Sequence, residues 1–408
     1  MKYNFDEIID RRKSNSLKWA VGENELPMWV ADMDFRTAPC ILEALQERLN
    51  HGIFGYSEIS KEWALAYQNW WQRRHNFRIE EHWLIFCTGV VPALSSLVRK
   101  LTTPNENVLI QTPVYNCFFS SIKNNGANVI SSELIYENGK YYIDWADFEE
   151  KLANPQTTLF ILCNPHNPIG KIWTKDELTQ MGELCHKHGV VVISDEIHCD
   201  LTEPNLSYTP FASASEICEN ISISCISPTK AFNIAGLNSA AVFAKNRFLR
   251  HKAWRAFNTD EIAEPNAFAV SATVAAFEKG EAWLEALREY LSENKKIVRE
   301  FLSENLPYIS ALPCDATYLM WLDCSHLINL SGTIPILSND DFKIPHRYEF
   351  RNSTKLAEFI RAKSGLYLSS GEIYGQGGAK FLRLNIATPK ANLLDGLNRL
   401  KTAILELL

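Results

Sequence analysis

The chain has 408 residues, of which 46% are hydrophobic and 22% are charged, a composition typical of a globular protein with a large buried core. Its formal net charge of -7, with no basic block to offset it, argues against a nucleic-acid partner. The length suits one large and one small domain.

The ten cysteines include no C-x-x-C pair, so the spacing typical of a metal site is absent and we predict no metal. Several of them stand in apolar, strand-like runs, where a thiol behaves as a small hydrophobic side chain. The first residues are charged and lack the apolar centre of a signal peptide, and no run approaches the roughly 20 apolar residues of a membrane span. We therefore expect a reducing, cytoplasmic compartment and no membrane partner.

The first part of the chain combines an irregular arm with two helices. Residues 1 to about 30 show no hydrophobic period, and the run Trp29–Phe35 (WVADMDF) leads to Pro39, a favourable first residue for the helix ILEALQERLN. A turn, Phe54–Tyr56, follows. The segment Lys61–His75 carries four large aromatic residues at helical spacing, which predicts a helix packed in the core.

The run Leu84–Pro92 (LIFCTGVVP) predicts a strand, a glycine turn and the start of a helix. The first N–H groups of a helix are unpaired and lie at the positive end of its dipole, which suits a phosphate. Many turns with this pattern bind nothing, so the pattern is a weak indication on its own.

From Val108 onward, short apolar strands alternate with helical patterns. The candidate strands are VLIQT, NVIS, LFILC, VVVIS and ISISCI. Near-continuous apolar strands are typical of a sheet that is buried on both faces, and the alternation indicates parallel βαβ connections. Because such sheets bind ligands beyond the carboxyl ends of their strands, polar residues at these ends are candidates for a site.

Three polar stretches stand at strand ends: Asn164–Gly170 (NPHNPIG), Asp195–His198 (DEIH) and Ser227–Gly236 (SPTKAFNIAG). Taken singly, each has an ordinary explanation, because Asn and Asp satisfy turn backbones and a lysine such as Lys230 is commonly a solvated surface residue. Their ordered occurrence on consecutive strands favours one shared site.

The ordered set TGVV, NPHNPIG, SDEIH and SPTKAFN resembles the signature segments of the fold-type I pyridoxal-phosphate enzymes, the aspartate aminotransferase family. The resemblance covers nearly the whole chain. Within that family, WVADMDF, the turn His51–Tyr56 and DEIHCD are most similar to the cystathionine β-lyase (C-S lyase) branch. The resemblance implies an α/β fold, a three-layer αβα sandwich with a mostly parallel sheet, and a smaller α+β domain.

We expect three parts in the chain. Residues 1–46 would form an N-terminal arm and a segment packed on the small domain, 47–285 the large cofactor-binding domain, and 286–408 the small C-terminal domain. Thr317–Leu322 predicts a strand of the small domain. The polar region 324–354 is longer than the family usually carries, and the sequence assigns it no role.

The resemblance assigns the central chemistry to Lys230 and Asp195. Lys230 would form the Schiff base with the aldehyde of pyridoxal 5'-phosphate, exchange it for the substrate amine and then remove the substrate α-proton. A lysine with the ordinary pKa of about 10.4 could not serve as that base at neutral pH, so its pKa must be lowered. Asp195 would face the pyridine nitrogen, and a carboxylate about 4 Å from a positive nitrogen gains roughly 4 kcal/mol at an effective dielectric of about 20.

Further residues would hold the cofactor. Asn167 would bond the ring hydroxyl oxygen and help to hold the substrate, and Tyr115 would stack on the ring face and contact the substrate. Tyr56 resembles the tyrosine that reaches the phosphate across a dimer interface, which would make the active site depend on a homodimer. The other phosphate contacts that the resemblance implies are backbone N–H groups and hydroxyls of Gly89, Val90, Val91, Ser227 and Thr229.

Two positions depart from the aminotransferase pattern. His198 stands three residues after the aspartate, where many aminotransferases carry a tyrosine, and we count it among the cofactor contacts. Asn238 replaces the arginine of a common Gly-Leu-Arg phosphate contact, so one cationic partner is missing. Both departures favour the lyase branch.

Near the C-terminus, the loop Gly371–Gly378, which we expect to be flexible, leads to the strand Phe381–Ile386 with Arg383 on one of its faces. A lone arginine in a strand is usually an ion-pair partner. Here it matches the family arginine that binds the substrate α-carboxylate through two parallel hydrogen bonds, a geometry that lysine cannot supply.

The function that the resemblance implies is β-elimination from an amino acid. Cystathionine, cysteine or a related S-conjugate would lose its α-proton and its β-thiolate and yield pyruvate and ammonia. An aminotransferase is the alternative, and it shares the cofactor contacts. A third possibility is a regulatory protein without turnover, against which the joint presence of Lys230, Asp195, Asn167 and Arg383 speaks. The substrate side chain and any domain closure stay undetermined.

Overall fold

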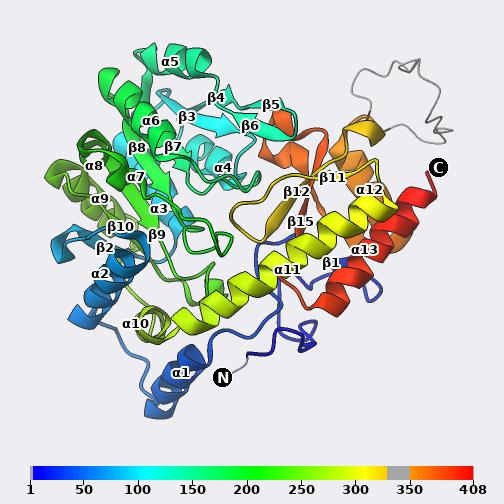
Figure 1. The fold of residues 1–408 in the computed structure, drawn as a ribbon. Coiled ribbons are helices and arrows are strands. Elements are labelled where there is room, and N and C mark those ends of the chain that lie inside the picture. Colours follow the sequence, from blue (N-terminus) through cyan, green and yellow to red (C-terminus); the bar gives the residue numbers. More distant parts are fainter. Residues whose placement is uncertain (1–2, 329–349, 408) are drawn as a thin grey trace.

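A seven-stranded sheet forms the centre of the larger part of the molecule (Figure 1). The computed structural model describes residues 3–328 and 350–407. Neighbouring strands from β9 to β4 run parallel, whereas β10 is antiparallel to both β9 and β2. In their order across the sheet, the strands are β2 (Leu84–Cys87), β10 (Ala240–Phe243), β9 (Ser222–Ile226), β8 (Val191–Asp195), β7 (Thr157–Cys163), β3 (Asn107–Thr112) and β4 (Asn128–Glu133).

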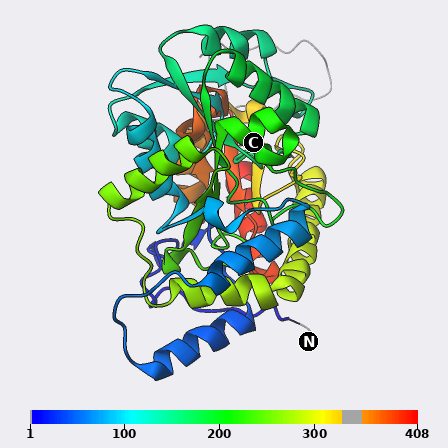
Figure 2. The same ribbon diagram turned by 90° about the vertical axis from the view of Figure 1, so that its left-hand side faces the viewer.

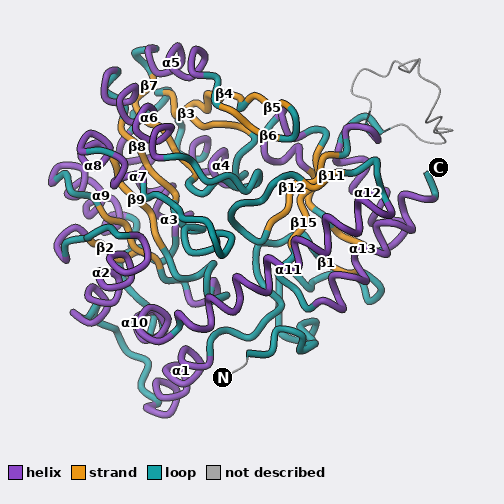
Figure 3. The backbone as a smooth tube through the Cα atoms, in the orientation of Figure 1, coloured by secondary structure: helices purple, strands orange, loops and turns teal. Residues whose placement is uncertain are grey.

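Helices cover both faces of this sheet, so its strands lie between two helical layers (Figure 3). Side chains alternate along a strand, and Ile161 and Ile193 pack toward α3 (Val90–Leu101), α4 (Cys117–Lys123) and α9 (Arg247–Thr259). Phe160 and Val192 pack on the other face, among α5 (Trp145–Ala153), α6 (Lys175–Lys187), α7 (Phe211–Ala214) and α8 (Glu216–Ile221). Burial on both faces explains the near-continuous apolar runs, and the predicted three-layer sandwich is confirmed.

A second, antiparallel sheet forms the smaller part, in the order β11 (Ser310–Ala311), β12 (Leu319–Asp323), β15 (Phe381–Asn385) and β14 (Ser369–Ser370). Helices α12 (Ser353–Ser364) and α13 (Lys390–Leu405) belong to this part. The 25-residue helix α11 (Glu281–Asn305) runs from α10 (Ala269–Lys279) to this part, so the expected boundary at residue 285 lies inside a continuous helix (Figure 1).

The N-terminal arm is tied to the smaller part by β1 (Leu26–Pro27), which pairs in parallel with β13 (Leu366–Tyr367). Helix α2 (Lys61–His75) buries four aromatic side chains in the core, as its spacing predicts. Helix α1 (Pro39–His51) and the segment after it lie at the periphery (Figure 2). The hairpin β5 (Ile135–Glu137) and β6 (Lys140–Tyr142) is also peripheral, and its strand residues are exposed except for Tyr141.

One local prediction, the start of a strand, differs from the structure. The strand predicted from Thr317 begins at Leu319, because Thr317 has φ +72°, a left-handed conformation that no strand residue adopts. The loop Gly371–Gly378 consists of two 3-10 turns, η4 (Gly371–Tyr374) and η5 (Gln376–Gly378), and its flexibility stays a prediction. A Cβ at Gly371 would lie 2.1 Å from the Gly378 carbonyl oxygen, so the loop needs glycine to close on itself.

Residues 3–328 also contain the 3-10 turns η1 (Glu81–Trp83), η2 (Ala235–Leu237) and η3 (Ser325–Leu327). Residues 329–349 of the polar region 324–354 lie outside the described residues. Within the part of the chain that the structure describes, no helix combines the length and apolar character needed to cross a bilayer.

Candidate active site

A single cavity at the carboxyl ends of the large sheet collects most of the predicted site residues. Strand β8 ends at Asp195, β7 leads to Asn167, and β9 leads to Lys230. The sequence predicted this convergence from the strand-end rule. The predicted residues that line the cavity are Gly89, Val90, Val91, Tyr115, Asn167, Asp195, His198, Thr229 and Lys230.

The amine of Lys230 lies in this cavity and donates a hydrogen bond from Nζ to the carbonyl oxygen of Ala31, 2.6 Å away. Burial and the nearby charge of Arg383 lower the pKa of Lys230 to about 8, against the opposing effect of Asp32 and Asp195. A substantial fraction of this amine is therefore neutral near pH 8 and able to act as a nucleophile or a base.

The carboxylate of Asp195 is buried in the same cavity. Its Oδ1 accepts a hydrogen bond from the backbone N–H of Ile197 at 3.2 Å. Burial raises the pKa of Asp195 to about 7, although the Ile197 N–H and the charge of Lys230 act in the opposite direction. A carboxylate in this environment favours a positively charged ligand group beside it.

His198 lies near the charges of Lys230 and Arg383 and is neutral. Burial, the charge of Lys230 and the charge of Arg383 together lower the pKa of His198 to about 3. Its Nδ1 is buried and has no hydrogen-bond partner among the described residues. The imidazole can therefore bond a ligand in the cavity.

Arg383, on β15 of the small sheet, does not line the cavity but contacts Asn167, which does. Its Nη1 donates to Oδ1 of Asn167 at 3.2 Å, and its Nη2 donates to the carbonyl oxygen of Trp29 at 2.9 Å. The guanidinium lies 4.8 Å from the ring centroid of Tyr374. The side chain is buried, so a carboxylate that displaced these neutral acceptors would meet a desolvated cation.

The residues predicted to bind a phosphate include a helix N-terminus and two hydroxyls. Gly89 is the N-cap of α3, and the N–H groups of Val90 and Val91 precede the first intrahelical hydrogen bond. Thr229 lines the same end of the sheet, but Ser227 does not line the cavity. The Ser227 hydroxyl donates to the Ser239 carbonyl oxygen at 2.7 Å and lies 2.7 Å from the Thr229 hydroxyl oxygen. Ser227 therefore contacts the lining residue Thr229 without lining the cavity itself.

Tyr56 lies apart from this cavity in its own chain. Its side chain is completely exposed, with a relative accessibility of 101%. It borders a surface depression that also includes Phe54, Leu237 and the segment Glu264–Phe268. The Lys230 cavity within one chain is thus formed without it.

The cavity also contains residues that the sequence did not single out for a role there. Thr88, Pro92 and Ile197 flank predicted residues in the chain. Ala31, in contrast, contacts Lys230 from a distant segment, which no local period reveals, and the motif WVADMDF gave a resemblance without a contact. These additional lining residues are Ala31, Thr88, Pro92, Cys163, Ile197, Ala235 and Ser239. Asn238, which the sequence analysis noted only as the replacement of an arginine, also lines the cavity.

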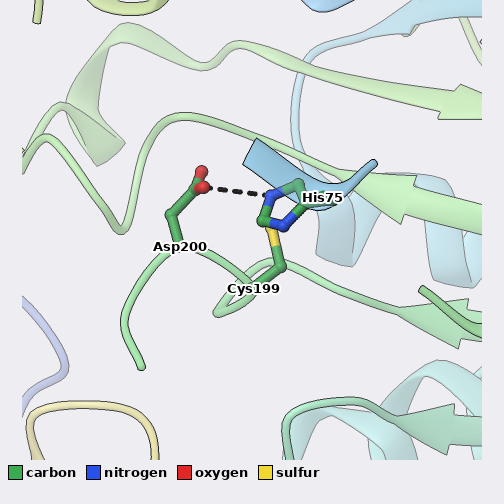
Figure 4. A group of neighbouring side chains, drawn as sticks. All are labelled: His75, Cys199 and Asp200. Atoms are coloured by element: carbon green, nitrogen blue, oxygen red, sulfur yellow. Dashed lines mark hydrogen bonds and ion pairs between the residues drawn. The ribbon is translucent and has the colours of Figure 1, made fainter. Parts of the chain in front are cut away.

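A separate group of side chains has a composition that could hold a metal, namely His75, Cys199 and Asp200 (Figure 4). Asp200 accepts hydrogen bonds from Trp70 Nε1 and from the His75 ring at 3.1 Å, and it lies 3.6 Å from the Arg74 guanidinium. Burial raises the pKa of the Cys199 thiol well above its usual value, which keeps the sulfur protonated. The group is a hydrogen-bonded charge cluster, because Arg74 already neutralises its carboxylate.

A lysine and an aspartate at the strand ends of a mostly parallel sheet, faced by an arginine from a second sheet, define the class of the molecule. The chain belongs to the family described as aminotransferase class I and II, whose model matches residues 18–400.

Within this family, the chain is similar to C-S lyases. It is 41% identical to cystathionine beta-lyase PatB of Bacillus subtilis over 407 residues, which covers 98% of this chain and all of PatB. It is 32% identical to protein MalY of Escherichia coli, covering 98% of this chain and 99% of MalY. The solved structure of a PLP-bound C-S lyase from Staphylococcus hominis matches with a TM-score of 0.88 and 34% identity over 99% of each chain.

Proposed function

We propose that this protein is a pyridoxal-phosphate-dependent C-S β-lyase, which acts on cystathionine, cysteine or a related S-conjugate and releases a thiol, pyruvate and ammonia. The observation that carries the proposal is the lowered pKa of the Lys230 amine in a cavity shared with Asp195. The similarity to PatB over nearly the full length of both chains supports the reaction type.

The donor set of the cavity fits pyridoxal phosphate. The amine of Lys230 suits the aldehyde, the carboxylate of Asp195 suits the ring nitrogen, and the start of α3 with the Thr229 hydroxyl suits the phosphate. Asn167 and His198 would bond the ring hydroxyl, with Tyr115 against the ring face. When bound, the cofactor supplies an aldehyde that links to amines and a ring that accepts electron density from the substrate α-carbon.

In the proposed reaction, Lys230 Nζ takes the α-proton of the amino acid. The electron pair of the broken C–H bond expels the β-thiolate as the C–S bond breaks, and hydrolysis of the remaining three-carbon unit gives pyruvate and ammonia. Arg383 would hold the α-carboxylate with a two-pronged contact, so that the α-proton faces Lys230. Asp195 would stabilise positive charge on the ring nitrogen.

We further propose that the protein works as a homodimer, in which Tyr56 contacts the phosphate in the partner's active site. Tyr56 is completely exposed, and Ile53 and Phe54 of the same segment are also exposed, which supports an interface at this segment.

The proposed three parts are residues 1–46, 47–285 and 286–408, with α11 crossing from the second to the third. All ten cysteines are unpaired, which supports the proposed cytoplasmic location.

The proposal is tested by incubating pure protein and added pyridoxal phosphate with cystathionine, and separately with pairs of amino and keto acids. Pyruvate, free thiol and glutamate are measured, with Lys230→Ala as the inactive control. Release of thiol and pyruvate without a keto acid is the expected result. Turnover that requires a keto acid would instead identify an aminotransferase, and no turnover in either assay would favour a regulatory protein.

A further inference from the structure

The segment Trp29–Phe35 crosses the active site and offers backbone carbonyl groups to functional side chains. The Ala31 oxygen accepts hydrogen bonds from Lys230 Nζ at 2.6 Å and from the Tyr318 hydroxyl at 3.0 Å. The Trp29 oxygen accepts one from Arg383 Nη2 at 2.9 Å. A carbonyl that accepts an N–H of a neutral amine fixes the rotation of that amine and hence the direction of its lone pair. The position of this segment therefore sets the direction from which Lys230 can take up a proton.

Two asparagines hold the segment on the side of the active site. Asn233 Oδ1 accepts the Met33 N–H at 3.0 Å, and its Nδ2 donates to the carbonyl oxygens of Met33 and Phe35 at 3.0 and 2.8 Å. Asn385 Nδ2 donates to the Asp32 carbonyl oxygen at 2.7 Å. The segment is thus fastened both to the loop that carries Lys230 and to the strand that carries Arg383.

On the other side, the buried carboxylate of Asp34 anchors the segment to the N-terminal arm. It accepts hydrogen bonds from Arg11 Nη1 at 2.7 Å, Lys18 Nζ at 2.8 Å and Trp19 Nε1 at 2.8 Å. Lys18 is itself fully buried, and Arg11 also pairs with Asp32 at 2.7 Å. Removing the charge of a buried carboxylate leaves its cationic partners uncompensated, so this anchor is costly to break.

We propose that Asp34 is a positioning residue for proton transfer, because through the segment Trp29–Phe35 it holds the Ala31 carbonyl against Lys230 and the Trp29 carbonyl against Arg383. The inference deepens the proposed function and rests on it, since it takes Lys230 as the base. Asp34 does not line the cavity and acts through the backbone between it and Ala31. A purely structural role would lower stability and leave proton transfer unchanged.

The test compares Asp34→Asn with the wild type, both loaded with cofactor. The variant keeps the shape of the side chain and removes its charge. We expect kcat to fall by about ten- to a hundredfold, since small misplacements of reacting groups have effects of this size. The isotope effect on an α-deuterated substrate should rise, because α-proton removal becomes more strongly rate-limiting. The pH dependence of the visible absorbance of the bound cofactor should also change, because that absorbance reports on the surroundings of Lys230.

Glu203→Gln is the matched control, because Glu203 pairs at 2.5 Å with another buried lysine, Lys295, which does not contact the segment. It should lose stability and keep the wild-type isotope effect and absorbance profile.

Trp19→Phe removes one neutral hydrogen-bond donor to Asp34 and should act in the same direction as Asp34→Asn with a smaller effect. This variant replaces Asp34→Asn in the test if Asp34→Asn does not fold.

A wild-type isotope effect and absorbance profile in Asp34→Asn, or in Trp19→Phe if the first variant does not fold, would overturn the inference. An absence of lyase activity in the wild type would instead overturn the proposed function. In that case the absorbance profile still tests whether Asp34 positions Lys230.

Discussion

Arg383 and Asn167 are 216 residues apart in the sequence and meet in one hydrogen bond of 3.2 Å between Nη1 and Oδ1. The bond joins a strand of the small sheet to a turn at the edge of the large sheet. The second outer nitrogen, Nη2, donates a hydrogen bond to the Trp29 carbonyl oxygen. Both outer nitrogens of the guanidinium are therefore hydrogen-bonded to neutral oxygens. A substrate carboxylate would replace neutral acceptors with charged ones, which strengthens both contacts.

Arg383→Lys is therefore expected to raise the KM for the amino-acid substrate by about ten- to a hundredfold, because one charged hydrogen bond of about 1.5–3 kcal/mol is lost. Steady-state kinetics measures this effect, and the visible absorbance of the bound cofactor should be unchanged. Arg361→Lys is the control, since Arg361 pairs with both oxygens of Glu25 away from the cavity. Equal KM values for Arg383→Lys and the wild type would contradict the assignment.

Asp195→Asn is expected to reduce the chemical step far more than cofactor binding. A neutral amide cannot compensate a positive ring nitrogen, and an interaction of roughly 4 kcal/mol corresponds to about a thousandfold in rate when it acts in the transition state. Single-turnover rates and the dissociation constant of the cofactor separate the two effects.

Glu196→Gln provides a matched control for this variant. Glu196 is the next residue, is also fully buried, and has its pKa raised to about 7 by burial. Its carboxylate bonds Ser194 and the Phe211 N–H instead of facing the cavity. The control should change stability and leave single-turnover rates intact, and an equal loss in both variants would contradict the role of Asp195.

The fold and the centre of the site could be predicted because both depend on local patterns. Apolar runs identified the strands, and polar residues at their ends, such as Asp195, had to converge at one edge of a parallel sheet. The antiparallel strand β10 and the contact between Ala31 and Lys230 depend on tertiary packing between distant segments, which has no local signature. Ser227 shows the same limit, since its position in the motif that carries Lys230 did not reveal that its hydroxyl bonds Ser239.

His166 should make stability depend on pH. Its ring nitrogen Nε2 contacts the Pro113 carbonyl oxygen at 2.9 Å, and burial together with the charge of Lys171 lowers the pKa of His166 to about 4. As pH falls from about 6.5 toward 4, the unfolded chain takes up a proton that the folded chain does not, so stability is lost in this window. The contribution reaches about 3 kcal/mol at its largest.

Urea unfolding at several pH values checks this expectation. The difference in unfolding free energy between the wild type and His166→Gln should shrink as the pH falls from 6.5 to 4. His251→Gln, which removes an exposed histidine of α9, should show a constant difference from the wild type. A constant difference for His166→Gln as well would contradict the effect.

Tyr56 allows a test of whether the active site is shared between two chains. In the proposed homodimer, Lys230→Ala and Tyr56→Phe are each expected to be strongly impaired when they are the only chain present. In a mixed dimer, the Tyr56→Phe chain keeps its own Lys230 and receives Tyr56 from its partner, so one complete site is restored. Mixing the two variants under conditions that exchange subunits should therefore recover activity, up to one site in each mixed dimer.

Mixing Lys230→Ala with Asp195→Asn is the control, because both defects lie in the same cavity and each mixed dimer then has no complete site. Mass spectrometry verifies that subunits have exchanged. If the first mixture then gains no activity, Tyr56 acts in the active site of its own chain.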